Sequence, residues 1–167
     1  AHDLQVLDEK TALDWYRQAA GQGHSEAQYH LALMHLNGQG VDQDLAAAAS
    51  QFMKIAEAGH RDAQYRLGQM HEFGNGVTES FEEAIYWYRL SANQGNDQAQ
   101  CKMGLMLSCG LGAEQDPKEA ADYFHLAAEQ DNGEALYHLG LMFYEGTGVT
   151  RNLDRSAHYY LRAAQQD

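Results

Sequence analysis

The 167-residue chain has little positive charge, a single proline, two cysteines and no long apolar run. Lysine and arginine together number 11 against 24 aspartates and glutamates, which gives a formal net charge of −13. Nucleic acids and anionic membrane surfaces are bound through basic footprints, so the composition disfavours both as ligands. No apolar stretch approaches the ~18 residues that a transmembrane helix needs, so direct membrane insertion is not expected. A basic protein partner is compatible with this charge, as is a surface that is simply soluble.

The two cysteines, Cys101 and Cys109, fall on one expected helix. At 1.5 Å of rise per residue their α-carbons would lie ~12 Å apart, whereas a disulfide needs less than ~7 Å. The sequence therefore predicts two unpaired thiols, which favours a reducing compartment only weakly.

Most of what is present repeats every 36 residues. The segment Gly-x-Gly-Val at 38–41 recurs at 74–77 and 146–149, and it returns as Gly-Leu-Gly-Ala at 110–113. A fixed period of 20–50 residues is typical of a solenoid, in which each repeat contacts its neighbours. Because the segment recurs between helices, we interpret it as a structural turn and not as a phosphate loop. The glycines assigned to this turn are Gly38, Gly40, Gly74, Gly76, Gly110, Gly112, Gly146 and Gly148.

Each period contains two amphipathic helices, and one of them opens on a residue that can cap a helix. The caps are spaced by 36 residues, at Asp8, Asp44, Ser80, Asp116 and Asn152. Their side chains can accept hydrogen bonds from the free N–H groups of a first helical turn. The boundaries expected from these caps are a lead-in at 1–7, helix-pair periods at 8–43, 44–79, 80–115 and 116–151, and a closing helix at 152–167.

The capped helices carry a stripe of alanines and aromatic residues, such as Trp15 and Tyr16 in the first copy, on one helical face. The other helix of each period carries alanine, leucine or methionine, and an internal glycine. Because a glycine within a helix costs ~1 kcal/mol relative to alanine, its recurrence predicts close helix–helix contact. These structural glycines are Gly68, Gly104 and Gly140.

The pattern Ala-x-x-x-Leu-Gly, then Gly-x-Gly-Val, then a cap followed by Ala-x-x-Trp/Phe-Tyr-x-x-Ala-Ala resembles the Sel-one-like repeat family. It is carried by Ala63 to Ala92 and by Ala135 to Ala164, and it covers nearly everything from Asp8 onwards. The resemblance implies an all-α, right-handed superhelical α/α solenoid of about four repeats plus a terminal helix, nine helices in all. It also implies that the Ala-x-x-x-Leu-Gly helix comes first in a repeat and lines a concave groove. The cysteine-rich members' disulfide is not transferred to this chain, because its two cysteines share one helix.

The face of these first helices opposite the Leu-Gly stripe is the candidate partner-binding surface. Tyrosine and arginine are favoured anchors in protein interfaces. The alternative is that the tyrosines of this face pack adjacent repeats together. The candidate residues are Tyr29, Leu33, Leu36, Tyr65, Arg66, Phe73, Lys102, Leu105, Tyr137, His138, Leu141 and Tyr144, with Gln69, Cys101 and Cys109 on the same face.

No motif for catalysis, a cofactor or a metal stands out. There is no Gly-x-Ser-x-Gly, no phosphate-binding loop and no Cys-x-x-Cys. His30 and His35 are five residues apart, whereas a metal-binding helical pair wants four. His35 and His71 occupy a position that the resembled family usually fills with an aromatic residue. The chain is therefore expected to be no enzyme, with no metal and no cofactor.

The resemblance implies a non-enzymatic adaptor or scaffold that binds a peptide or protein in its groove. The alternative that it also implies is an inhibitor or immunity protein that caps a toxin or enzyme. Members of the family are often bacterial, and periplasmic or secreted, which slightly favours the periplasm over the cytoplasm here. The sequence names neither the partner nor the oligomeric state.

Overall fold

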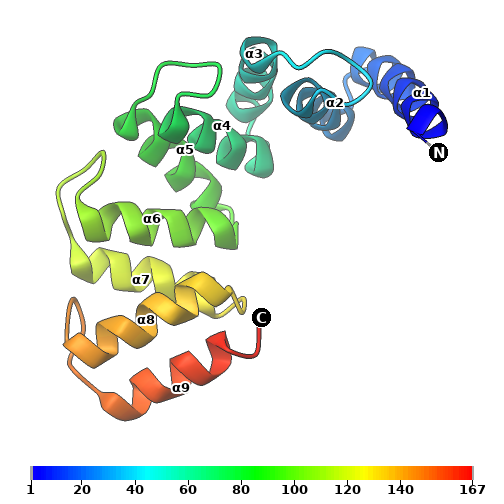
Figure 1. The fold of residues 1–167 in the computed structure, drawn as a ribbon. Coiled ribbons are helices and arrows are strands. Elements are labelled where there is room, and N and C mark those ends of the chain that lie inside the picture. Colours follow the sequence, from blue (N-terminus) through cyan, green and yellow to red (C-terminus); the bar gives the residue numbers. More distant parts are fainter. Residues whose placement is uncertain (1, 167) are drawn as a thin grey trace. The chain divides into compact units, whose positions relative to one another are not determined.

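The computed structural model describes residues 2–166, with the side chains of residues 8–166 (Figure 1). In this part of the chain there are nine helices and no strand, as the sequence predicted. The chain divides into two compact units, with the boundary between Glu79 and Ser80. The first unit holds α1 (His2–Gly21), α2 (Ser25–Asn37), α3 (Leu45–Glu57) and α4 (Arg61–Phe73). The second holds α5 (Phe81–Asn93), α6 (Asp97–Cys109), α7 (Pro117–Ala128), α8 (Gly133–Glu145) and α9 (Leu153–Ala163).

Within each unit, every helix packs against the next one along the chain, as Figure 1 shows for α5 to α9. The core of each unit is therefore a row of seams between consecutive helices, which is the arrangement of a helix-pair repeat. None of the helices in residues 2–166 combines the length and the apolarity needed to cross a membrane.

Four of the five predicted caps are formed. The side chain of Asp44 accepts a hydrogen bond from the N–H of Ala47, and Ser80, Asp116 and Asn152 cap α5, α7 and α9 in the same way. The fifth prediction is wrong, because α1 begins at His2, so Asp8 lies inside the helix and the lead-in expected at 1–7 is helical from residue 2. A cap residue ends up within a helix when the residues before it also favour helical backbone, and cap chemistry alone does not reveal that.

The Gly-x-Gly turns are structural, as predicted. Their first glycine ends a helix, and their second glycine allows a close backbone contact. The first glycine has a left-handed backbone and ends the helix, as at Gly110, whose N–H donates to the carbonyl of Met106. At Gly76, Gly112 and Gly148 the second glycine lies against the first turn of the preceding capped helix. A Cβ placed on Gly112 would be 2.2 Å from the carbonyl oxygen of Phe81, and one on Gly148 would be 2.1 Å from that of Pro117. Only a residue without a side chain allows this approach.

Two of the helix glycines, Gly104 and Gly140, lie under aromatic rings. A Cβ on Gly104 would come within 2.7 Å of the Phe124 ring, and one on Gly140 within 2.8 Å of the Tyr160 ring. The close helix–helix contact predicted for these two glycines is therefore confirmed, and Gly68 is also buried. At Gly104 and Gly140 the ring of a capped helix thus fills the space that the glycine leaves on the helix before it.

The aromatic stripe is buried only where a neighbouring helix covers it. Tyr88, Phe52 and Phe124 are fully buried, whereas Trp15 of the first helix is 67% exposed. α2 is the main helical neighbour of α1, and Trp15 lies on a face of α1 that is left open to solvent.

We expect Gly112→Ala to destabilise the protein more than Gly95→Ala. Both glycines have positive φ, so each substitution costs about 1–2 kcal/mol for a left-handed alanine. Gly95 has open space around its missing Cβ, whereas Gly112 faces the carbonyl of Phe81, which adds an overpacking cost of about 1–3 kcal/mol. Urea unfolding of the two variants measures the difference, and equal losses would mean that the close approach carries no energy.

A second prediction concerns the glycine–ring contact. In an open helix position Gly104→Ala would gain ~1 kcal/mol from helix propensity. Here we expect a net loss, because the new methyl group would overlap the Phe124 ring. Phe124→Leu should cost less in the Gly104→Ala background than in the wild type, since the smaller side chain relieves the overlap. Denaturant unfolding of the four proteins tests this, and additive losses would contradict it.

Candidate functional site

Three of the predicted groove residues come together in the first unit. Leu36 of α2 and Arg66 and Phe73 of α4 line a pocket of about 370 Å³. The rest of its wall comprises Gln43, Leu45, Gln69, Met70 and Asn75. Phe73 is 57% exposed, although it is one of the large apolar side chains of the unit. The pocket therefore pairs an open aromatic surface with one cation.

Arg66 is held in place by a short chain of hydrogen bonds. Its Nη1 donates to Oε1 of Gln69 at 2.9 Å, and Nε2 of Gln69 donates to the hydroxyl of Tyr65 at 3.0 Å. The Nε of Arg66 is buried and has no hydrogen-bond partner, and no carboxylate among the described residues pairs with this guanidinium. A fixed guanidinium without its counter-ion is a donor available to an incoming oxygen atom.

The remaining candidates of the first unit are closer to packing contacts. Tyr29 is half-buried, and its ring stacks on His60 at 5.0 Å and meets Phe52 edge-on at 5.7 Å. Tyr65 is 8% exposed. Leu33 is half-buried. Tyr29 thus contacts residues outside its own helix and Tyr65 is buried, which agrees with the alternative interpretation of this position as a packing contact.

In the second unit the candidates do not gather in one pocket. Lys102, Leu105 and Leu141 are half-buried, and the ring of His138 stacks on Phe124 of α7 at 5.1 Å. Tyr137 and Tyr144 are 51% and 55% exposed. Tyr137 also lies 5.7 Å from Tyr160 and lines, with it, a pocket of about 580 Å³ between α8 and α9.

Cys101 takes the place of the tyrosine in the third copy, and it is buried. Cys101 is 1% exposed, whereas Cys109 is exposed. Neither thiol forms a disulfide, as predicted. Burial raises the pKa of the Cys101 thiol, and the carboxylate of Glu134, which accepts a hydrogen bond from it, raises that pKa further. The thiolate that nucleophilic chemistry requires is therefore not formed near neutral pH.

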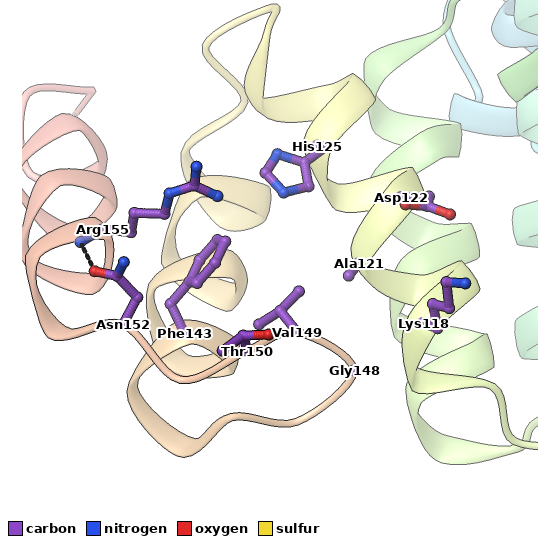
Figure 2. Close-up of a pocket in the computed structure, with 10 residues that line it drawn as sticks. All are labelled: Lys118, Ala121, Asp122, His125, Phe143, Gly148, Val149, Thr150, Asn152 and Arg155. Carbon is purple, nitrogen blue, oxygen red and sulfur yellow. Dashed lines mark hydrogen bonds between the residues drawn. The ribbon is translucent and has the colours of Figure 1, made fainter.

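A second pocket, which the sequence did not indicate, lies between α7 and α9 (Figure 2). It measures about 400 Å³ and contains none of the predicted groove residues. Phe143 forms part of its wall, with the guanidinium of Arg155 5.4 Å from the ring centroid. Its lining residues are Lys118, Ala121, Asp122, His125, Phe143, Gly148, Val149, Thr150, Asn152 and Arg155.

Around Phe143 the side chains form a compact aromatic cluster. The ring of Tyr159 stacks on Phe143 at 5.6 Å, and His125 meets the same ring edge-on at 6.0 Å. The hydroxyl of Tyr159 and Nδ1 of His125 are hydrogen-bonded at 3.3 Å. Burial lowers the pKa of His125, so its imidazole is neutral at neutral pH. No cluster of three or more metal-ligating side chains occurs among residues 8–166.

The repeated helix pairs, the Gly-x-Gly turns and the ring-on-glycine seams define a helix-pair repeat protein. The chain belongs to the Sel1 repeat family, whose model matches residues 4–24, 25–60, 61–96, 97–132 and 133–167. In this phase each full repeat starts on a first-type helix, such as α2, and the match at 4–24 falls on α1. A search of curated proteins found no match.

Solved structures show the same fold. A protective antigen present in uropathogenic Escherichia coli strains, which displays an SLR fold, is 41% identical with a TM-score of 0.89 over 92% of this chain and 33% of its own. A Sel1 repeat protein from Oxalobacter formigenes is 31% identical with a TM-score of 0.89 over 95% of this chain and 64% of its own. This chain therefore spans a third and somewhat under two thirds of these relatives. An immunity protein from Pseudomonas aeruginosa, 18% identical with a TM-score of 0.51 over 92% of this chain and 72% of its own, shares the fold alone.

The contrast between the two cysteines is testable by alkylation. We expect iodoacetamide to modify the folded protein once, at Cys109, because the Cys101 thiol is buried and stays protonated. Mass spectrometry should find no label on Cys109→Ser and one label on Cys101→Ser. Labelling of Cys109→Ser under native conditions would show that Cys101 is reactive.

Proposed function

We propose that this chain is a non-enzymatic protein-interaction module, and that the pocket of α2 and α4 holds a segment of a partner protein. Its repeats place side chains on the helix surface without changing the seams that hold the helices together. Membership of a repeat family whose fold serves as a scaffold supports this function.

The observation that carries the proposal is the pairing of Phe73 with Arg66 in one pocket. The exposed ring of Phe73 offers an apolar anchor, and truncating such anchors costs most in protein interfaces. The guanidinium of Arg66, fixed by Gln69 and lacking an ionic partner, can donate to a carbonyl or carboxylate oxygen of the bound segment. Leu36 completes the apolar wall between them. Together they suit an extended segment with one apolar side chain.

The inhibitor or immunity role stays an alternative, because the immunity protein of similar fold shares only 18% identity with this chain. Salt dependence separates the two roles. A pocket that relies on Phe73 should retain its partner at 1 M salt, whereas a cap that relies on the net charge of −13 should release it.

The test is a comparative pull-down from the source organism's lysate followed by affinity measurement with the captured protein. The double variant Arg66→Gln/Phe73→Ala should bind that protein more than about tenfold more weakly than the wild type, since hot-spot truncations cost 2 kcal/mol or more. Leu161→Ala is the control, because Leu161 is 66% exposed in the second unit and lies outside this pocket.

Melting temperatures of the three proteins should agree within a few degrees. Equal capture by the wild type and the double variant would place the interface away from α2 and α4. It would overturn the proposed pocket.

A further inference from the structure

Two residues that line the pocket between α7 and α9 differ in charge from their equivalents one repeat earlier. One period earlier, between α5 and α7, Arg89 and Glu119 form an ion pair with an N–O distance of 3.9 Å. Adding 36 residues to each gives His125 and Arg155. The carboxylate of Glu119 is thus replaced by the guanidinium of Arg155, and the guanidinium of Arg89 by the neutral imidazole of His125. Within the second unit, the Arg89–Glu119 ion pair therefore shows how these two positions interact when their charges are opposite.

Arg155 consequently has no internal counter-ion. Its guanidinium lies over Phe143, and no carboxylate among the described residues is within ion-pair distance of it. Figure 2 shows Arg155 on one side of the pocket and Lys118 and Asp122 together on the other. Because Lys118 and Asp122 have opposite charges, the uncompensated charge of the pocket is the single positive charge of Arg155.

Polar donors and the ring of Phe143 lie on the same side of the pocket as this charge (Figure 2). Thr150 and Asn152 line the pocket beside Arg155, and a hydroxyl and an amide can both donate to an anion. Phe143, Val149 and Ala121 supply the apolar surface. An occupant must therefore carry one negative charge and, within a few ångströms of it, an apolar group.

We propose that this pocket binds the C-terminal residue of a partner protein, with its α-carboxylate on Arg155 and an apolar last side chain on Phe143 and Val149. A C-terminal residue carries its carboxylate and its side chain on the same carbon, so one residue spans the short distance from Arg155 to the Phe143 ring. A carboxylate from an internal glutamate would need a neighbouring residue to supply the apolar group.

The overall charge of the chain favours the same choice. With a net charge of −13, the protein repels acidic segments, and the repulsion grows with every carboxylate that they carry. A chain end that contributes a single carboxylate meets the least repulsion. This site shares no residue with the pocket of α2 and α4, so either proposal can fail without the other.

The experiment uses three peptides and ¹⁵N-labelled protein in NMR titrations. The first is Ac-Gly-Ser-Gly-Leu with a free C-terminus, the second is the same peptide as a C-terminal amide, and the third is Ac-Gly-Leu-Glu-Gly-amide. We expect the first to shift the signals of Val149, Thr150 and Arg155 in a saturable way. The other two peptides should bind at least about tenfold more weakly. The amide has no carboxylate for Arg155, and the internal-glutamate peptide carries its carboxylate on a different residue from its apolar side chain.

The matched control is the double variant His125→Arg/Arg155→Glu. It introduces the ion pair that Arg89 and Glu119 form one repeat earlier and replaces the guanidinium of the pocket by a carboxylate, so it should lose the shifts. Because it also removes the hydrogen bond between His125 and Tyr159, the ¹⁵N spectrum of the free variant is used to check that it is folded. Arg155→Gln, which removes the charge alone, should also lose them. Equal binding of acid and amide, equal binding of the internal-glutamate peptide, shifts that persist in the double variant, or no saturable shift up to 10 mM peptide would each overturn the proposal.

Discussion

The rest of the structure depends on the approach of a loop glycine to the first turn of a neighbouring helix. Gly112 lies against the carbonyl of Phe81, and Gly148 against that of Pro117, at distances that exclude any side chain. This contact brings the loop that precedes one capped helix onto the start of the capped helix before it. Once that spacing is set, the ring of Phe124 reaches the bare backbone of Gly104 on α6. Backbone contacts therefore determine the repeat, and side chains fill the spaces that they leave.

As a consequence, positions outside the seams can differ from repeat to repeat. The candidate sites occur at positions that differ in this way. The tyrosine position is a packing contact at Tyr29 and a buried thiol at Cys101. The cation at Arg66 has a histidine equivalent, His138, which stacks on a ring instead of facing a pocket. The solenoid keeps its fold through these exchanges because none of them replaces a glycine of the turns or of the helix seams.

The sequence predicted the features that recur and missed those that depend on a neighbour. Caps such as Asp44 and glycines such as Gly104 return every 36 residues, so each copy supports the interpretation of the others. The exposure of Trp15 could not be predicted, because the same stripe is buried wherever another helix covers it. The pocket at Arg155 arises from contacts between helices about 34 residues apart, as in the Tyr159–His125 hydrogen bond. Its one signal in the sequence was the replacement of Arg89 and Glu119 by His125 and Arg155.

Each of the two candidate pockets contains an arginine and an aromatic ring within a strongly acidic protein. Cations are scarce, 11 against 24 carboxylates, and most of the guanidiniums that the structure shows are paired, as Arg162 is with Asp131 at 2.7 Å. Arg66, Arg151 and Arg155 are exceptions, and two of them line a pocket together with an aromatic ring, Arg66 with Phe73 and Arg155 with Phe143. A guanidinium next to an apolar wall offers two contacts at once to an oxygen atom that arrives with an apolar group attached. The acidic surroundings disfavour ligands that carry many negative charges, which agrees with the neutral or singly charged segments that we propose as occupants of the two pockets.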